Sequence, residues 1–529
     1  MKRIFPYPLL FVTAIVFDRV AISITQIDPE QSLRSLFVLL FLGMVALFTL
    51  QRFVKDWQRA DFTIFMAALL FVLYKPLYRT IVWNFPQQAD YLGIALIPLL
   101  GWLYAVVTSR KLWRFIRKPA QLTYYLNLVC ATLLMFQVVR LGEGFYARSA
   151  SKNGLTAVPA LTEEIRLEGD TRPDIYIIIL DGYGRRDVLQ SIYGYDNSEF
   201  IGGLEKRGFY IPTKNHSNYI QTTYAMASLW NFDYLQPWAP PSDYGQYILQ
   251  PIQNNRAFEL LHDAGYTTVS FEGALSYTQI YNADVYLTNS LPLNKFEALS
   301  LVDTPLEPLS NIFDLKIPVP TYKTHRTRTL YKFDALKTVP NAVPGPKIVY
   351  AHFLMPHPPF VFDRYGNALP QQQPYKLWDD SETAGGAEEY RQGYREQVTF
   401  VNGKVLQAID GVIANSKTPP VILVMGDHGP ASMFHFDIDA PGCVWERTGN
   451  LYALRLPGHL NDGALYPTIS PVNTFRVIFN AYFGAELPLL EDRSYLAASQ
   501  YKAEIKDVTN SRDSLAGCAM PGGQNPADE

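Results

Sequence analysis

Apolar residues are spread unevenly along this chain of 529 residues. In the first 145 residues they form long runs, and short polar stretches separate one run from the next. A helix needs about 20 apolar residues to cross a bilayer, and each run comes close to that length. The runs are 4–24, 34–53, 62–83, 91–109 and 122–141. The pattern therefore predicts a transmembrane domain of five helices in residues 1–142.

Lysine and arginine are concentrated in alternate connections between these runs. The connections 25–34 and 84–90 hold one basic residue and none. Short loops rich in Lys and Arg stay in the cytoplasm, so we expect a cytoplasmic N-terminus and, after five crossings of a bacterial inner (plasma) membrane, a periplasmic or extracellular chain beyond Gly142. The basic residues of the other connections are Lys2, Arg3, Arg52, Lys55, Arg59, Arg110, Lys111, Arg114, Arg117 and Lys118.

The first run has an alternative interpretation as a cleaved signal peptide. Asp18 and Arg19 interrupt it, and four more runs follow without a small-residue cleavage pattern, so we favour an integral membrane protein. Asp18, Arg19, Lys75 and Arg79 lie in or at the ends of apolar runs, where charge is costly. Such charges either mark a functional path or are met by snorkelling and interhelical pairing, which is the simpler interpretation here.

Residues 143–172 are polar and small, as is typical of a linker, and the pattern then changes. From 173 to 507, short apolar runs of strand length alternate with helical patterns, which predicts an α/β domain with a mainly parallel sheet between helices. The first run, in 174–184, is uninterrupted, as in a central strand covered on both faces. The other patterns are helix, turn and strand in 254–273, helix and strand in 394–429, strands in 347–355 and 450–458, and a late helix with Ser470 as its cap.

Reactive side chains follow three of the predicted strands. Asp181 comes directly after the first strand, His357 follows a middle strand, and Asp427 with His428 follows a late one. Ligands of open α/β sheets bind at the carboxyl ends of the strands, so we expect these side chains to converge. Asp and His are ordinary ligands of Zn²⁺ or Mn²⁺, and together they predict a divalent cation site. Singly, each has a structural alternative, since Asp-Gly is a common turn and Asp-His-Gly can cap a helix.

A pair of threonines offers a candidate nucleophile. Thr222 and Thr223 stand at the start of a helical pattern within 215–231. Backbone N–H groups at a helix start favour an anion, and a bound dication lowers the pKa of a nearby hydroxyl. The alternative role of such a threonine is a plain N-cap.

Charge and cysteine content narrow the picture further. A net charge of −3 and a pI near 6.3 lack the basic footprint of a nucleic-acid-binding protein. Cys130 lies in the fifth apolar run. Cys443 and Cys518 lie in the part predicted to be outside, where they either form a disulfide or remain free thiols. Residues 508–529 are expected to form a flexible tail.

The order of these motifs resembles the alkaline phosphatase superfamily. Its members have an Asp after the first strand, a Thr, Ser or Cys at a helix start, a His-x-Pro segment and a late Asp-His-Gly. Within it, a multi-span membrane segment followed by an external catalytic domain is similar to lipoteichoic acid synthases and lipid A phosphoethanolamine transferases. The domain also resembles sulfatase-like hydrolases. The resemblance covers about residues 173–485.

This resemblance implies roles for seven residues. One divalent cation, Zn, Mn or Mg, would be held by Asp181, Thr222, Asp427 and His428. Thr222 would be the nucleophile, and His357 would contact the substrate anion or protonate the leaving group. His352 and His216 would line the substrate pocket.

Three features depart from the relatives. The synthases and transferases generally have Glu where this chain has Asp181. The Cys/Ser-x-Pro-x-Arg sequence from which sulfatases make formylglycine is absent around Thr222. No histidine has an Asp four residues before it, the pair that binds the second metal of two-zinc phosphatases, so we expect one cation.

The implied function is a metal-dependent phosphoryl transferase that acts on lipid-linked or envelope phosphoesters through a Thr nucleophile. Its substrate would be a membrane phospholipid or an envelope glycan, and the irregular stretches 232–253, 280–345 and 361–390 would form the rim of the pocket. One alternative is a hydrolase of phosphate or sulfate esters. Another is a non-catalytic, membrane-anchored envelope protein that binds a glycan or an assembly partner, which the complete set of ligand types disfavours.

Overall fold

The structure, a computed structural model, describes most of the chain as two compact units. Unit 1 comprises Met1–Leu155, Ser290–Thr321 and Gln371–Pro374, and unit 2 comprises Thr156–Asn289, Tyr322–Pro370 and Tyr375–Glu529. The described residues are 6–24, 29–84, 100–101, 103–104, 107–108, 111–154, 167, 172–236, 250–290, 293–301, 304, 321–370, 375–382, 384–460, 462–497 and 505–518.

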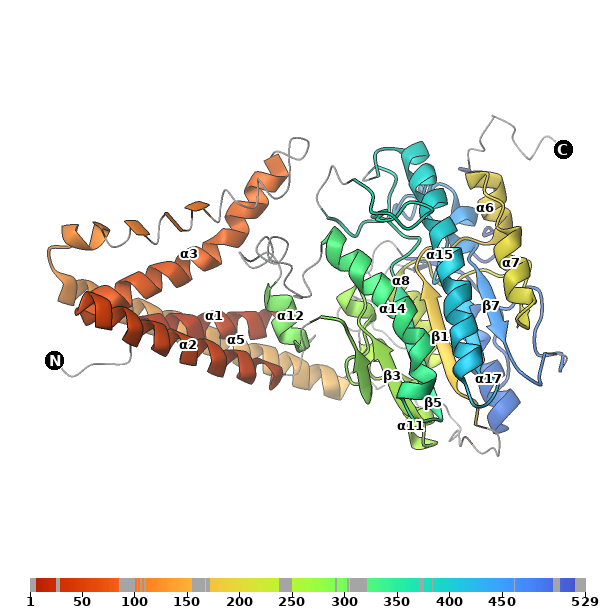
Figure 1. Cartoon of the computed structure of the whole chain (residues 1–529), viewed down its shortest axis with the longest axis horizontal. Helices are drawn as coiled ribbons and strands as arrows, with labels where there is room; N and C mark the ends of the chain where they lie inside the picture. Colours follow the sequence, from red (N-terminus) through yellow and green to blue (C-terminus); the bar gives the residue numbers. More distant parts are fainter. Residues whose placement is uncertain are drawn as a thin grey trace. The chain divides into compact units, whose positions relative to one another are not determined.

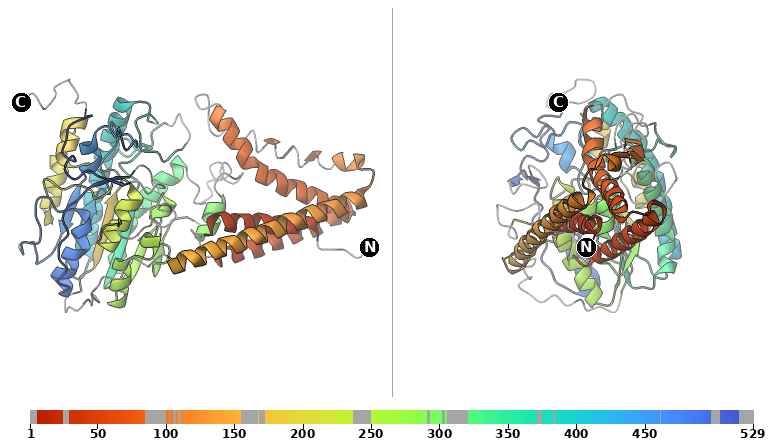
Figure 2. Two further views of the ribbon diagram at one scale, coloured as in Figure 1. Left: turned by 180° about the vertical axis from the view of Figure 1, so that it is seen from behind. Right: turned by 90° about the vertical axis from the view of Figure 1, so that its left-hand side faces the viewer.

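Unit 1 is helical, and Figure 2 shows several of its helices end on. The helices are α1 (Tyr7–Ser23), α2 (Gln31–Val54), α3 (Trp57–Asn84), η1 (Trp113–Phe115), α5 (Pro119–Gly154) and α12 (Lys295–Leu301). Helix α1 contacts α2, α3 and α5. Asp18 of α1 accepts a hydrogen bond from Nη1 of Arg140 in α5 at 2.6 Å, so interhelical pairing meets this charge.

Two of the described helices, rather than the predicted five, are long and apolar enough to span a membrane. They are α2 and the Pro119–Tyr146 part of α5. Helix α1 has only 17 residues, and α3 has a proline, Pro76, inside the helix. The predicted run 91–109 lies largely outside the described residues. The prediction of five spanning helices is therefore not confirmed.

Helix α12 belongs to unit 1, although in the sequence it lies between two elements of unit 2. Phe296 of α12 is buried in one cluster with Val16 and Val20 of α1. Glu297 forms an ion pair with Arg34 of α2. These two contacts join α12 to α1 and α2 of the helical unit.

Unit 2 is organised around a mixed sheet of seven strands in the order β2-β7-β6-β1-β5-β3-β4. The strands β1, β3, β4, β5 and β6 run parallel, and near one edge β7 pairs antiparallel with both β6 and β2. The strands are β1 (Ile175–Leu180), β2 (Phe209–Tyr210), β3 (Thr267–Phe271), β4 (Val285–Leu287), β5 (Lys347–Phe353), β6 (Val421–Met425) and β7 (Tyr452–Arg455). A mainly parallel sheet was predicted, and only its edge departs from that pattern.

Helices cover both faces of this sheet, as Figure 1 shows. Tyr176 and Ile178 of β1 belong to the core under α14 and α15, whereas Ile177 and Ile179 belong to the core that contains α8 and α17. Every residue of β1 is therefore buried, which explains its uninterrupted apolar run. The helices of unit 2 are α6 (Arg186–Tyr193), α7 (Ser198–Glu205), α8 (Thr222–Asn231), α10 (Gln250–Gln253), α11 (Arg256–Asp263), η2 (Ser276–Thr278), α14 (Tyr322–Ala342), α15 (Ala387–Asn415), α16 (Val444–Thr448), η3 (Pro471–Asn473) and α17 (Thr474–Phe483).

The late helix begins differently from its prediction. Pro471 lies in a 3₁₀ turn, η3, and α17 starts only at Thr474. Ser470 makes no side-chain cap bond to this turn. Its hydroxyl instead donates to Oδ1 of the half-buried Asp492 at 2.7 Å, because a carboxylate is a stronger acceptor than a neutral group.

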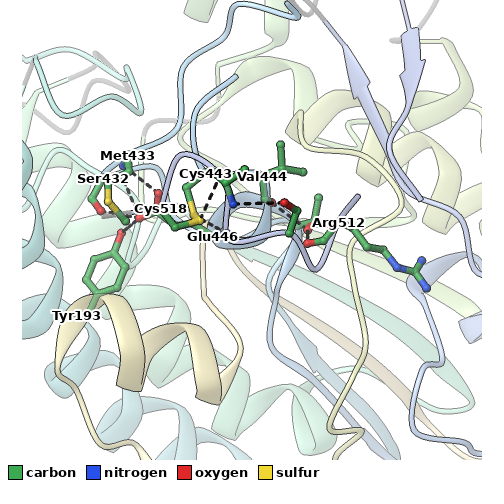
Figure 3. Close-up of a disulfide and its surroundings, with 11 residues drawn as sticks. Tyr193, Ser432, Met433, Cys443, Val444, Glu446, Arg512 and Cys518 are labelled. Atoms are coloured by element: carbon green, nitrogen blue, oxygen red, sulfur yellow. Dashed lines mark hydrogen bonds between the residues drawn. A yellow bond between two sulfur atoms is a disulfide. The ribbon is translucent and has the colours of Figure 1, made fainter. Parts of the chain in front are cut away.

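A disulfide between Cys443 and Cys518 holds the C-terminal segment (Figure 3). Strands β8 (Tyr495–Ala497) and β9 (Ile505–Asp507) form a small antiparallel sheet ahead of it. The described chain continues in turns to Cys518, through the start of the segment 508–529 that was expected to be a tail. The alternative of two free thiols is excluded here, and the disulfide gives this segment an anchor that the sequence pattern lacked.

Candidate metal centre and active site

The strand order brings the predicted ligands together. Strand β1 lies between β6 and β5, so the residues that follow β1 and β6 meet at one edge of the sheet. Asp181 is the residue after β1, and Asp427 and His428 follow β6 after a single glycine, Gly426. His352 is the partner of Ile179 in the register of β5 with β1, so it reaches the same edge.

Three of these side chains form a buried group that can hold a cation. His428 Nε2 lies 3.3 Å from Asp427 Oδ2 and 3.7 Å from Asp181 Oδ1. One ligand atom from each of Asp181, Asp427 and His428 lies within 4.8 Å of the others. Both carboxylate oxygens of Asp181 are buried without a hydrogen-bond partner among the described residues. A buried carboxylate is costly unless it is paired or coordinates a metal, so the residues present fit a divalent cation.

The electrostatics of the two carboxylates agree with this assignment. Burial and the charge of Asp427 raise the pKa of Asp181 well above its usual range. Burial also opposes the charge on Asp427, but neighbouring groups, His428 above all, lower the pKa of Asp427. Two carboxylates this close repel when both are ionised, and a dication removes that repulsion.

His428 is held in the tautomer that a metal ligand requires. Burial lowers its pKa to about 4, so the ring is neutral at pH 7. Nδ1 lies 2.9 Å from the carbonyl oxygen of Gly429, which can only accept, so Nδ1 carries the proton. The lone pair on Nε2 then faces the site, 3.1 Å from the Thr222 hydroxyl.

Thr222 is the first residue of α8, and its side chain is aimed at His428 rather than at the backbone. The N-cap of α8 is Gln221, which makes no side-chain cap bond. Thr223 is also buried, but its hydroxyl has no partner among the described residues. The two threonines therefore differ in surroundings, and Thr222 is the one whose hydroxyl contacts the cation-binding group.

His357 and His352 lie close to the same group. The backbone N–H of His357 donates to the carbonyl oxygen of Asp181 at 3.0 Å. Its Nε2 is 4.0 Å from Asp379 Oδ2. His352 Nε2 is 3.4 Å from Asp181 Oδ2 without a hydrogen bond between them. Both side chains are buried, and burial lowers the pKa of His352 to about 4.

His216 takes part in a different network. Its Nε2 lies 3.1 Å from Arg185 Nη1 and 2.9 Å from Asp513 Oδ1. Its Nδ1 lies 3.2 Å from the hydroxyl of Thr448. These contacts bind the C-terminal segment to the loop before α8, and they do not involve the residues of the cation-binding group.

Sequence reasoning missed a buried ion pair at the centre, Arg447 with Asp379. Arg447 lies on α16, and its Nη2 is 3.1 Å from His428 Nε2. Burial alone would raise the pKa of Asp379, but Arg447 and His357 hold it well below its usual range. No motif marks either residue. The only signal was that Asp379 falls in the stretch 361–390, which was expected to form the substrate rim.

The short helix α16 that carries Arg447 is fixed on two sides (Figure 3). Its N-cap, Cys443, belongs to the disulfide. Glu446 accepts hydrogen bonds from the Tyr193 hydroxyl at 2.6 Å and the Ser432 hydroxyl at 2.6 Å. The disulfide and the hydrogen bonds of Glu446, which lie outside the cation-binding group, therefore fix the position of the Arg447 guanidinium.

Comparison with known proteins gives structural likenesses only. No family model matches the chain, and no curated protein matches it. Among solved structures it is similar to the C-terminal periplasmic domain of EcEptC from Escherichia coli, with 12% identity, a TM-score of 0.42 and coverage of 67% of this chain and 98% of that one. It is similar to BT1596, a 2-O GAG sulfatase, with 15% identity, a TM-score of 0.38 and coverage of 60% and 72%.

A third similar structure is the phosphonate monoester hydrolase of Agrobacterium radiobacter, with 14% identity, a TM-score of 0.41 and coverage of 61% of this chain and 80% of that one.

Proposed function

We propose that this protein is a membrane-anchored, cation-dependent enzyme that transfers or hydrolyses a phosphoryl group, with Thr222 as nucleophile. The observation that carries the proposal is the buried, unpartnered Asp181 carboxylate beside Asp427 and His428, with the Thr222 hydroxyl 3.1 Å from His428 Nε2. A structural turn or helix cap does not require two carboxylates and a neutral imidazole to converge without polar partners.

The residues that would hold the cation are Asp181, Asp427, His428 and Thr222. When bound, the cation lowers the pKa of the Thr222 hydroxyl and offsets negative charge on the phosphoryl oxygens. The carboxylates and the Nε2 lone pair of His428 are pre-oriented for this by the strand ends and by the Gly429 carbonyl.

The chain supplies a two-step displacement. Thr222 Oγ, having given its proton to solvent, attacks phosphorus, the bond between phosphorus and the leaving oxygen breaks, and His357 donates a proton to that oxygen. The acceptor hydroxyl, from water or an alcohol, then attacks phosphothreonine and gives its proton to His357, while the bond between phosphorus and Thr222 Oγ breaks and Thr222 recovers a proton from solvent. Asp379 Oδ2 lies 4.0 Å from His357 Nε2, so a carboxylate stands beside the proposed proton donor.

The donor that we propose is a membrane phospholipid, and the acceptor is water or an envelope glycan hydroxyl. The two apolar helices in unit 1 support a site that works on lipid-linked substrates at an external membrane surface. Water as acceptor makes the enzyme a hydrolase. A non-catalytic binding protein would have no need for a hydroxyl in contact with the cation-binding group.

A substrate assay tests the proposal. Purified full-length protein in detergent is incubated with labelled phosphatidylethanolamine or phosphatidylglycerol, with and without Mn²⁺ or Zn²⁺. Cation-dependent release of the labelled head group is expected. If no head group is released with either donor and either cation, the alternative of a non-catalytic binding protein is favoured.

The adjacent threonines give a matched test of the nucleophile. Thr222→Ala should abolish turnover and the trapped phosphothreonine, since no other hydroxyl touches His428 among the described residues. Thr223→Ala should keep most of both and lose at most about 2 kcal/mol of stability. Mass spectrometry of protein quenched during turnover locates the modification, and phosphate on Thr223 would contradict the assignment.

A further inference from the structure

The proposed mechanism gives no role to the buried guanidinium of Arg447, which contacts the cation-binding group. Arg447 is 2% exposed. Its Nε donates to the carbonyl oxygen of Ile220 at 3.1 Å, and its Nη1 donates to that of Gly429 at 3.0 Å. Ile220 leads into the nucleophile helix and Gly429 follows His428, so Arg447 bridges the two segments that carry Thr222 and the Asp-His pair.

The Nη2 group of Arg447 has His428 Nε2 as its acceptor, and a cation bound to that nitrogen would take its lone pair. Nη2 lies 3.1 Å from His428 Nε2, which has a single lone pair. The Thr222 hydroxyl lies at the same distance from that atom. A cation bound to Nε2 takes the lone pair, so the Nη2–H loses its acceptor next to the nucleophile. A buried charged donor without an acceptor costs several kcal/mol, and a substrate oxygen beside Thr222 would satisfy it.

Asp379 holds the Nη1 side of the Arg447 guanidinium in place. Its Oδ2 pairs with Arg447 Nη1. Its Oδ1 accepts a hydrogen bond from the Tyr390 hydroxyl at 2.6 Å. The planar fork is thereby fixed from one side, which leaves Nη2 directed toward the Thr222 and His428 side of the centre.

The centre also needs more positive charge than one dication supplies. In phosphoryl transfer, negative charge lies on the non-bridging oxygens, and enzymes meet it with metal ions and arginine. The Asp-x-x-x-His pair of two-zinc phosphatases is absent from this chain. Arg447 is a fixed positive charge in contact with a cation ligand, and so it lies where a second charge can act.

We propose that Arg447, held by Asp379, binds a non-bridging oxygen of the substrate phosphate through Nη2 and so supplies the second positive charge of the centre. The assignment rests on the proposed function. It makes Arg447 a catalytic residue that contacts the substrate, and Asp379 a positioning residue that acts through it.

The test separates anion binding from cation binding. Isothermal titration of the full-length protein in detergent measures affinity for Mn²⁺ and then, in its presence, for inorganic phosphate. Arg447→Lys should weaken phosphate binding about 10- to 100-fold, because one charged hydrogen bond is lost. Mn²⁺ stoichiometry should remain one and its affinity should change by less than about threefold.

Two further variants keep the test decisive. Arg447→Gln with Asp379→Asn replaces the pair by neutral groups of similar shape, which avoids an unpaired buried charge if the lysine variant misfolds. The matched control is Arg476→Lys, since Arg476 is also buried but donates to the carbonyl oxygens of Phe232 and Pro488. The control should bind phosphate as the wild type does.

The outcomes are distinguishable. Phosphate affinity that is unchanged in a folded Arg447 variant with normal Mn²⁺ binding would overturn the role of Arg447 and leave the proposed function intact. A wild-type protein that binds no Mn²⁺ would overturn the proposed function and, with it, this inference.

Discussion

The buried carboxylates of Asp181 and Asp427 are close enough for their charges to repel, and this repulsion has a measurable consequence. Asp427→Asn removes one charge with little change in shape. Without metal the variant should unfold at the same temperature as the wild type or lower, because the pKa of Asp427 lies below its usual range and the folded state therefore favours its charge. Added Mn²⁺ should raise the unfolding temperature of the wild type and not that of the variant, because a ligand that binds only the folded state stabilises it.

Thermal unfolding of full-length protein in detergent, with and without Mn²⁺, measures both effects. Asp410→Asn is the matched control, since Asp410 is exposed and pairs with Arg207, and neither residue belongs to the cation-binding group. If Asp427→Asn responds to Mn²⁺ as strongly as the control, Asp427 is not a ligand.

A second residue-scale prediction concerns His325 of α14, which lies outside the cation-binding group. Burial, with Arg328 next in effect, lowers its pKa to about 3 from the usual 6.5. Its Nε2 lies 3.0 Å from the carbonyl oxygen of Leu354, so the neutral ring donates there. Because the folded-state pKa is depressed, the unfolded chain binds the proton first as the pH falls below about 6.5.

His325 therefore contributes stability above pH 6.5 that is lost as the pH falls toward 3. His325→Gln should reduce the acid slope of the unfolding free energy by up to about 1.4 kcal/mol per pH unit in that window. Denaturant unfolding at several pH values measures the slope. His262→Gln, at a mostly exposed histidine, should leave it unchanged.

At the scale of the elements, the position of the short helix α16 depends on the disulfide between Cys443 and Cys518. The disulfide joins its N-cap, Cys443, to Cys518 across 75 residues. Cys518→Ser should cost about 2–4 kcal/mol of stability under oxidising conditions. Reductant should lower the wild type to the level of the variant, and it should not affect the variant itself.

The same variant tests the link between α16 and the centre. Arg447 lies on α16, so release of the C-terminal segment should weaken phosphate binding as well as stability. Cys130→Ala is the control, because Cys130 is the free cysteine of the described chain and lies in unit 1. Equal phosphate affinity in reduced and oxidised wild type would show that the disulfide serves stability alone.

At the scale of the whole molecule, the helical unit makes a prediction of membrane topology. Segment Ser290–Thr321 leaves unit 2, contacts α2 through Arg34 and Glu297, and returns to unit 2. The start of α2 should therefore lie on the same side of the membrane as β4 and α14. The distribution of basic residues among the connections predicts that this side is outside.

Reporter fusions test this topology. A reporter after Arg59 or Lys118 should be cytoplasmic, and one after Gly154 should be external. A cysteine introduced at Glu30, beside α2, should react with an impermeant thiol reagent in intact cells. A cytoplasmic reporter at Gly154 would remove the envelope assignment altogether.

The local sequence was enough to predict the strands and helices of the α/β domain and the reactive side chains that directly follow its strands. The β1 run is apolar at every position because both faces of a central strand are covered, and that pattern can be read without a structure. Strand ends carry the candidate metal ligands Asp181, Asp427 and His428, which were expected to converge because ligands bind at the carboxyl edge of such sheets. The lengths of the apolar runs, by contrast, led to five predicted spans, whereas two of the described helices are long and apolar enough to cross a membrane.

Only the tertiary structure decided which groups share the centre. Arg447 and Asp379 are 68 residues apart in the sequence and belong to no motif, so nothing local marks their ion pair. His352 reaches Asp181 because β5 lies next to β1, whereas His216 is drawn into a network with Arg185 and Asp513. The periodic pattern of apolar residues shows which face of a strand or helix is buried, but it does not show which distant segment packs against that face. Contacts between distant segments depend on strand order, loop paths and the disulfide, which are properties of the packed chain.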